Sequence, residues 1–490
     1  MTRSIGLLLL LVATLLPACS AQKSDAAGGS SAGAGENAGG TNAGGTSGGT
    51  SAVDSGVVSG TRLRAQYLTT ADGARQFFGW FDKNLNVSCH FGMADDGRIR
   101  CLPDSGALVG AAFLDANCTQ QLAQFDASSC AGPPTFVLKS STGDCGPSSE
   151  VYAVGAAQTP SQVFYSSSTG CAASPTPTTQ KFYALGAKAD AATFLDAASA
   201  GVPSGHRLDP IFTIASDGAK QRTGWFDSTM HGECVVSVAA DQKMRCLPST
   251  PAIVLDTFSD AACSAPLAQS VANAQCGSSD TPTFAFKIDT NACPAATHLY
   301  AITGKLAATQ VYVQQAGACA AAAAGTATYY QVTELNPPEF DLFLPVQSGA
   351  ERLLQPALVD ADGAAELSRT LFDSQRNEAC GFAQAADGKT RCLPSGASAL
   401  FTNANCMQPV AVATPDCAGN APHYAELLEG DACTGGTGVH ALGSTMSVSS
   451  VYAPGADGSC MPSAAPGATF YGVGAEVDAT QFVAATSVTE

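Results

Sequence analysis

The chain has 490 residues, 19 of which are cysteine, and a formal net charge of −18. The negative charge excludes a typical nucleic-acid-binding protein, which needs a positive surface, and it disfavours electrostatic docking on anionic lipid. The many cysteines exclude a reducing cytosol and indicate an oxidising compartment.

Residues 1–18 have the pattern of a bacterial lipoprotein signal peptide. A twelve-residue apolar run, Ile5 to Leu16, is too short to span a membrane and has the length of a signal-peptide core. The letters LPAC follow, end at Cys19 and resemble a lipobox. We predict cleavage before Cys19, acylation of Cys19 and anchoring in the cell envelope, most simply at the outer membrane. The alternative is an ordinary secretory signal that is cut nearby.

Residues 19–58 consist mainly of Gly, Ala, Ser, Thr and Asn after the acylated cysteine. Such a composition cannot bury a hydrophobic core and predicts a flexible tether. A tether at this place would separate a membrane anchor from a folded body.

The rest of the chain repeats one unit three times. The letters RCLP begin at Arg100, Arg245 and Arg391, with offsets of 145 and 146 residues. Other landmarks keep the same phase, including an Arg-Leu pair, an Asp-Gly pair and the letters WFD, which become LFD in the third unit. Repetition of this kind sets the organisation of the chain. The predicted repeats are residues 59–203, 204–347 and 348–490.

The cysteines follow the same repeats, with six in each and Cys19 left over. An even number in each repeat predicts disulfide bonds rather than a metal site, because no Cys-x-x-Cys is present. The predicted disulfide cysteines are Cys89, Cys101, Cys118, Cys130, Cys145 and Cys171 in the first repeat; Cys234, Cys246, Cys263, Cys276, Cys293 and Cys319 in the second; and Cys380, Cys392, Cys406, Cys417, Cys433 and Cys460 in the third.

The spacing of these cysteines also predicts local pairs. Cys89 and Cys101 stand at equal distances from a presumed hairpin turn, so they should face each other across two antiparallel strands. The same reasoning makes Cys118–Cys130 and Cys145–Cys171 the simplest further pairs. Equivalent pairs are expected in the other two repeats.

Short apolar and β-branched runs predict an all-β fold. In the first repeat the predicted strands are residues 62–69, 75–82, 87–93 and 98–103, separated by Asp-Gly turns that favour hairpins. Two architectures fit three such repeats. One is a β-propeller that the repeats close together, and the other is three separate small β-domains.

An aspartate and an arginine stand 18 residues apart in every repeat. The pairs are Asp82 and Arg100, Asp227 and Arg245, and Asp373 and Arg391. We interpret them as structural ion pairs between neighbouring strands, with an acid and a guanidinium that bind a ligand as the alternative. Trp80 and Trp225 are interpreted as core residues, because the third repeat has Leu371 in the same position.

The chain resembles a group of uncharacterised, Cys-rich bacterial surface lipoproteins. The resemblance rests on the RCLP and GWFD landmarks that follow a lipobox and a tether, and it implies class and location but no activity. No catalytic, metal or cofactor motif is present, so the expected protein is a non-enzymatic cell-envelope lipoprotein that needs no cofactor. Its expected partners are the membrane and an envelope protein or glycan, but not nucleic acid. The alternative is an extracellular hydrolase with its site in a propeller channel.

Overall fold

A computed structural model describes the chain from residue 56 onward, with interruptions. The described residues are 56–104, 108–126, 132–143, 146–167, 170–177, 180–250, 252–270, 282–315, 318–325, 327–349, 351–413, 417, 419, 421–429, 436–454, 459–465 and 467–490. Within these ranges the chain is all-β, as predicted, and its only helical elements are three single 3₁₀ turns, η1 (Ala191–Thr193), η2 (Pro337–Glu339) and η3 (Ala479–Gln481). The predicted signal peptide, Cys19 and most of the predicted tether lie outside the described residues.

Each repeat begins with an antiparallel meander of strands that pair in chain order. The first meander contains β2 (Leu63–Thr70), β3 (Arg75–Asp82), β4 (Val87–Met93) and β5 (Ile99–Pro103). These bounds match the predicted strands to within one residue. The first turn places Gly73 at a φ of 98°, a conformation that side chains rarely adopt, and this explains the Asp-Gly signal.

The second and third meanders repeat this pattern. The second contains β14 (Leu208–Ala215), β15 (Lys220–Asp227), β16 (Gly232–Val238) and β17 (Met244–Pro248). The third contains β26 (Leu353–Val359), β27 (Ala365–Leu367), β28 (Leu371–Asp373), β29 (Glu378–Gln384) and β30 (Thr390–Pro394). Here β27 and β28 together take the place of a single strand, because the third repeat carries one extra residue at this point.

Three linking strands join the meanders into one closed ladder. They are β13 (Asp196–Gly201), β25 (Leu342–Ser348) and β38 (Ala485–Thr489), and each follows one of the 3₁₀ turns. β13 pairs with β5 and with β14 of the next repeat, and β25 likewise pairs with β17 and β26. β38 pairs along β2 of the first repeat and is bridged to β30. The ladder therefore returns to its start.

This pairing differs from both expected architectures. The blades of a propeller are separate sheets, and separate domains would share no strands. Here each linking strand hydrogen-bonds to two repeats, so the three meanders form a single sheet. β1 (Val57–Val58) adds to this sheet by pairing with β15, so these two residues belong to the folded body rather than to the tether.

Between its meander and its linking strand, each repeat inserts a closed five-stranded barrel. In the first barrel, β6 pairs with β7, β7 with β12, β12 with β9, β9 with β8, and β8 returns in parallel to β6. The strands are β6 (Leu108–Phe113), β7 (Gln121–Asp126), β8 (Phe136–Gly143), β9 (Gly146–Gln158) and β12 (Gln180–Lys188). A hairpin of β10 (Gln162–Ser167) and β11 (Gly170–Pro175) extends from β6.

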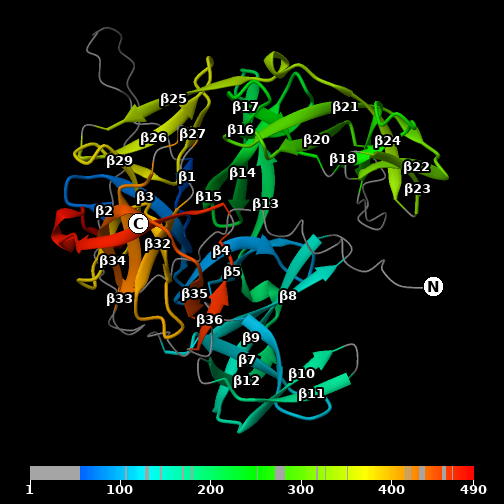
Figure 1. Cartoon of the computed structure of the whole chain (residues 1–490). Helices are drawn as coiled ribbons and strands as arrows, with labels where there is room; N and C mark the ends of the chain where they lie inside the picture. The colour runs from blue at the N-terminus through cyan, green and yellow to red at the C-terminus, as the bar shows by residue number, and fades with distance from the viewer. Residues whose placement is uncertain are drawn as a thin grey trace, which may run out of the picture. The chain divides into compact units, whose positions relative to one another are not determined.

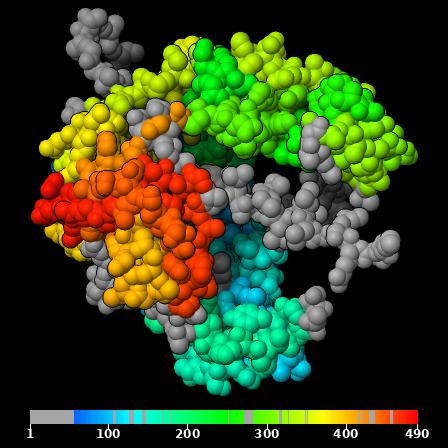
Figure 2. Space-filling model, viewed as in Figure 1, coloured from blue at the N-terminus to red at the C-terminus, as the bar shows by residue number. Residues whose placement is uncertain are grey.

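The other two barrels have the same topology and the same added hairpin (Figure 1). The second barrel contains β18 (Ala252–Phe258), β19 (Pro266–Ser270), β20 (Phe284–Asp289), β21 (Ala296–Leu306) and β24 (Thr328–Glu334), with the hairpin β22 (Gln310–Gln315) and β23 (Ala318–Ala323). The third contains β31 (Ala397–Phe401), β32 (Pro409–Ala413), β33 (Tyr424–Glu429), β34 (Gly436–Met446) and β37 (Thr469–Glu476), with the hairpin β35 (Val451–Pro454) and β36 (Cys460–Ser463). Orange and red atoms mark the surface of this third barrel in Figure 2.

Small side chains fill the barrels, because five strands enclose a narrow interior. The second strands of the three barrels place Ala123, Ala268 and Ala411 at equivalent positions, each 0% exposed. Alanine at these three positions allows the strands of each barrel to pack closely.

Tryptophan connects neighbouring repeats inside the meander core. Trp80 is 1% exposed, and its indole Nε1 donates a 3.0 Å hydrogen bond to Gln221 of the second repeat. Trp225 donates in the same way to Glu366 of the third repeat. Leu371 replaces the tryptophan in the third repeat and is also buried. The expectation that these residues lie in the core is confirmed.

Candidate functional site

The predicted ion-pair residues form ion pairs, but with other partners. Asp82 does not pair with Arg100. Instead, Arg62 donates from Nε and Nη2 to both carboxylate oxygens of Asp82, at 2.7 to 3.0 Å. The Asp82 side chain is 1% exposed and also accepts hydrogen bonds from two backbone amides of the following turn. The equivalent pairs are Arg207–Asp227 and Arg352–Asp373.

Arg100 pairs with an aspartate four residues earlier in the chain. Its Nη2 lies 2.6 Å from Asp96, and the guanidinium hydrogen bond holds the pKa of the Asp96 carboxyl below its ordinary value. The equivalent pairs are Arg245–Asp241 and Arg391–Asp387. The sequence contains a signal for these pairs, because an Asp precedes the RCLP arginine by four residues in every repeat, whereas the Asp–Arg spacing of 18 residues does not correspond to an ion pair.

Together, the two arginines of a repeat hold its 3₁₀ turn. Arg62 donates to the carbonyl oxygen of Thr193 at 2.9 Å, and Arg100 donates to that of Phe194 at 2.6 Å. The Phe194 ring is 0% exposed under the turn. The same contacts reach Glu339 and Phe340 in the second repeat, and Gln481 and Phe482 in the third. These charges therefore hold the corner from which each linking strand starts.

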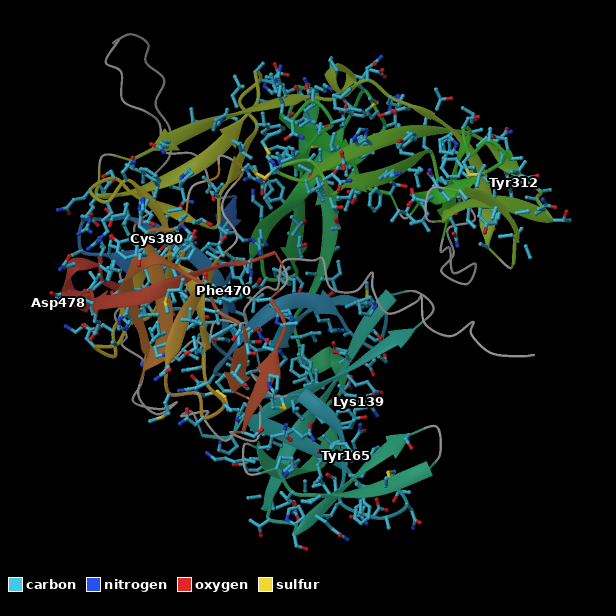
Figure 3. All side chains as sticks on the ribbon, viewed as in Figure 1. Lys139, Tyr165, Tyr312, Cys380, Phe470 and Asp478 are labelled. Atoms are coloured by element: carbon cyan, nitrogen blue, oxygen red, sulfur yellow. A yellow bond between two sulfur atoms is a disulfide. The ribbon has the colours of Figure 1, made fainter. Side chains whose placement is uncertain are left out.

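The first predicted disulfide of each repeat has the predicted partners. Cys89–Cys101, Cys234–Cys246 and Cys380–Cys392 join the third and fourth strands of the meanders, with Cα atoms 5.3 to 5.4 Å apart. Figure 3 labels Cys380. Both sulfurs of each bridge are buried in the meander core.

The second predicted disulfide is wrong. Cys118 is bonded to Cys171 rather than to Cys130, and Cys171 is therefore not bonded to Cys145. The bond ties the loop after β6 to the hairpin that extends from the barrel, and these come together only in the folded barrel. The equivalent bonds are Cys263–Cys319 and Cys406–Cys460.

One disulfide connects two different repeats. Cys293 of the second repeat is bonded to Cys417 of the third, with a Cα separation of 5.2 Å. The expectation of local pairs for these two cysteines is therefore wrong. The remaining predicted disulfide cysteines lie outside the described residues; they are Cys130, Cys145, Cys276 and Cys433.

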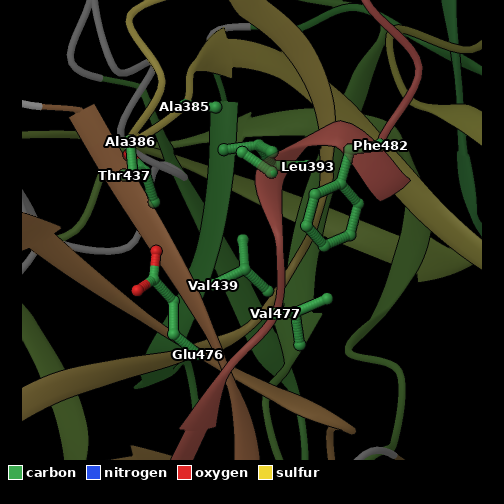
Figure 4. A pocket seen from close by; sticks show the side chains of 9 residues that line it. Ala385, Ala386, Leu393, Thr437, Val439, Glu476, Val477 and Phe482 are labelled. Carbon is green, nitrogen blue, oxygen red and sulfur yellow. The ribbon is translucent and has the colours of Figure 1, made fainter.

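A first cavity lies between the third meander and the third barrel (Figure 4). It is lined by Leu393, Val439, Val477 and Phe482. Its empty volume is about 160 Å³, but the space is too narrow to hold a water molecule. It is a packed joint rather than a ligand site.

A second cavity is an open groove of about 360 Å³ where the first meander meets the second. One wall is formed by residues of β4 and β5, and the other by residues of β14 and β15. Phe91, Met93 and Ile99 make the first wall apolar, whereas Thr213, Gln221 and Thr223 make the second wall polar.

A histidine–aspartate pair lies at this groove. His90 lines it, and His90 Nδ1 is 2.5 Å from a carboxylate oxygen of Asp104. Both side chains are exposed, at 54% and 40%. His90 is not part of the repeated pattern, because the second and third repeats have Val235 and Gly381 at its position.

The described ranges show neither a metal centre nor a membrane helix. Within them, no three His, Cys, Asp or Glu side chains are grouped so that they could hold a metal ion. The same ranges contain no apolar helix of the length that crosses a membrane.

Comparison with known proteins places the chain in a family. The model of a family of unknown function, DUF7481, matches residues 46–482. The chain belongs to this family. The DUF7481 match extends through all three repeats and includes the groove and both sets of ion pairs. No curated protein and no solved structure matches the chain.

Proposed function

We propose that this DUF7481 protein is a lipid-anchored, non-enzymatic protein of the cell envelope that acts as a binding module. The observation that carries the proposal is that the charged side chains repeated in all three units bind one another. All twelve Arg and Asp side chains of the two repeated ion pairs bind each other, and the arginines also bind backbone carbonyls of the 3₁₀ turns. Groups held in this way are not available for acid–base chemistry.

The proposed location rests on the cysteines and on the start of the chain. Seven disulfides among the described residues support an oxidising, extracellular environment. The LPAC letters and the Gly/Ser-rich segment support an anchor at Cys19 with a tether behind it. Dual acylation would give stable anchoring, because a single chain binds membranes only reversibly.

Metabolic labelling with an alkyne-tagged fatty acid tests the anchor. The parent chain should carry the label and sediment with membranes, and a Cys19→Ser variant should lose both properties. The variant Cys89→Ser/Cys101→Ser is the matched control and should keep the label. A parent chain without label would contradict the anchor.

Saturable binding to purified envelope fractions tests the binding function. Fluorescent chain should bind proteins or glycans of the envelope and should be displaced by excess unlabelled chain. Binding that is absent, or that is not displaced, would contradict the proposal.

The alternative is an extracellular hydrolase, and the His90–Asp104 pair favours it. A histidine held by a carboxylate is an arrangement that general-base catalysis uses. Hydrolysis of extracellular polymers by the parent chain and its loss in His90→Ala would support this alternative. The control Lys83→Ala should keep the activity, and activity that persists in His90→Ala would show a contaminant instead.

A further inference from the structure

The three repeats allow each junction between neighbouring meanders to be compared with two others in the same molecule. A position that is filled alike in all three junctions serves the fold. A position that differs only at the junction holding the groove needs another explanation. The side chains that surround the groove therefore have two sets of equivalents in the same molecule.

Large apolar side chains fill the second junction. Phe343 of its linking strand is 1% exposed and lies in one cluster with Val236, Met244 and Leu358. Phe343 also contacts Trp225, with ring centroids 6.5 Å apart. The junction is therefore closed by hydrophobic packing.

The third junction is filled in a similar way. Leu68 packs there with Leu371, Phe382 and Ala485. Leu68 and Leu358 are equivalent positions on the first strands of their meanders. Both junctions thus place leucine at this point.

The first junction departs from both other junctions at one filling position. Thr213 takes the place of Leu68 and Leu358, whereas Ala197, which is smaller than Phe343 of the second junction, matches Ala485 of the third. Thr213 is 5% exposed, so a hydroxyl is buried where the other junctions bury methyl groups. Thr213 lines the groove of about 360 Å³, a volume within the usual range of ligand sites.

The polar wall of the groove is held in position. Thr213 and Gln221 face each other across β14 and β15. Trp80 Nε1 can only donate, so the Gln221 side chain must present its oxygen to it at 3.0 Å. This contact fixes the orientation of the amide.

The rim also differs from the other junctions. His90 and Asp104 are replaced by Val235 and Ser249 in the second repeat, and by Gly381 and Ser395 in the third. The His90–Asp104 pair, whose nitrogen and oxygen atoms are 2.5 Å apart, therefore occurs at the junction that holds the groove. The equivalent positions of the other repeats have no such pair.

The lining indicates the chemical class of the ligand. It contains no lysine or arginine, and the chain carries a net charge of −18, so an anion is disfavoured. Phe91, Met93 and Ile99 face hydroxyl and amide groups across the groove. A sugar has the same division, with an apolar ring face and hydroxyl edges.

We propose that the first junction binds a neutral saccharide between the apolar wall of β4–β5 and the polar wall of β14–β15. This inference rests on the proposed binding function and names its site and ligand class. The second and third junctions carry leucine at the position of Thr213 and lack the His90–Asp104 pair.

Titration of the full chain in detergent with maltose, cellobiose and diacetylchitobiose tests the proposal, with digalacturonate as the acidic comparison. At least one neutral disaccharide should bind, and digalacturonate should bind more weakly or not at all. Thr213→Leu and Ala197→Phe each install a residue that another junction already carries, and each should lower the affinity at least tenfold. Val235→His, at the closed second junction, is the matched control and should bind like the parent.

Hydrogen exchange of the parent chain gives a measurement that does not depend on whether the variants fold. The neutral disaccharide should protect amides of β4 and β15, but not those of the equivalent strands β16 and β27. Failure of every neutral disaccharide to bind, or unchanged binding in both filling variants, would overturn the proposal. If the envelope fractions are still bound in that case, the proposed binding function stands and the ligand class fails.

Discussion

At the scale of single residues, one aspartate in each repeat has an unusually large structural role. Asp82 is almost fully buried, yet it accepts hydrogen bonds from the Arg62 guanidinium and from the backbone amides of Asn84 and Leu85. Removing one member of a buried ion pair leaves the other charge without compensation. The carboxylate of Asp82 therefore stabilises both the ion pair with Arg62 and the turn that follows β3.

We expect Asp82→Ala to lower the free energy of unfolding by about 3–5 kcal/mol, because Arg62 would lose its partner. Denaturant unfolding of the variant and of the parent measures this difference. The exposed neighbour Lys83→Ala is the control and should stay within about 0.5 kcal/mol of the parent. Equal stability of Asp82→Ala and Lys83→Ala would show that the pair has no structural role.

The stability of the fold should also depend on pH through three carboxyl groups, those of Asp96, Asp241 and Asp387. The hydrogen bond from an arginine lowers the pKa of each carboxyl from its ordinary value of 3.8. A lowered pKa in the folded state contributes stability above that ordinary value, and the contribution is lost as the pH falls through the folded-state pKa. The melting temperature should therefore fall below about pH 4.

Thermal melts of the parent and of Asp96→Asn between pH 7 and pH 2.5 check this expectation. The variant should melt at a lower temperature than the parent at neutral pH. Its melting temperature should then fall by less than that of the parent when the pH is lowered. Asp362→Asn, at an exposed turn position, should follow the parent. An acid response in Asp96→Asn as steep as in the parent would contradict the assigned role.

These residues show how far sequence reasoning reaches. The constant spacing of Asp82 and Arg100 indicates that both residues serve the structure, but Asp96 has an equally constant spacing of 4 residues from Arg100, and Arg62 lies 20 residues before Asp82, with 21 residues at the same place in the third repeat. Spacing alone does not say which side chains face each other, because that depends on the register of β2 against β3 and on the turn before β5. The fold identifies Arg62 and Asp96 as the partners.

At the scale of elements, local pairings were predictable and distant pairings were not. The hairpin disulfide Cys89–Cys101 has the predicted partners, but the register places Cys89 opposite Pro103 and Cys101 opposite Phe91, so the two cysteines meet diagonally across the strands rather than face to face. Cys118–Cys171 joins a loop to a hairpin that follows it by 53 residues, and only the closed barrel brings them together. The barrel closes through a parallel pair, β6 with β8, which no hairpin rule indicates.

Removing the disulfide Cys118–Cys171 should lower the stability of the fold more than removing the hairpin disulfide Cys89–Cys101. By the chain-entropy relation, a loop of 53 residues corresponds to about 4 kcal/mol, and one of 12 residues to about 3 kcal/mol. Denaturant unfolding of Cys118→Ser/Cys171→Ser and of Cys89→Ser/Cys101→Ser compares the two. Peptide mapping without reduction should recover Cys118 joined to Cys171, and recovery of Cys118 with Cys130 would contradict the pairing.

At the scale of the whole molecule, the repeats are connected by two kinds of link. The linking strands pair each repeat with the next, and the disulfide Cys293–Cys417 connects the second repeat with the third. The sequence showed three repeats but not their connection, because a strand that pairs with two repeats looks like any other short strand. The open groove was also hidden, since it results from side chains that are smaller than their equivalents.

A specific protease site placed after Gly349 tests the disulfide link. Cleavage there separates Cys293 from Cys417 in the chain, so the disulfide should keep the two fragments together on a non-reducing denaturing gel. Reduction should release them, and a Cys293→Ser variant should release them without reduction. Fragments of the parent that separate without reduction would show that this bond does not form.

Hydrogen exchange of β2 tests the closed ladder most directly. β38 supplies backbone partners to β2, with Val488 opposite Tyr67, so Val488→Pro removes an amide and disturbs the closing pair. The closed ladder predicts that amides of β2 exchange at least tenfold faster in Val488→Pro than in Val488→Ala, while those of β7 in the first barrel are unchanged. Equal exchange of β2 in the two variants would contradict the closure of the three repeats into one sheet.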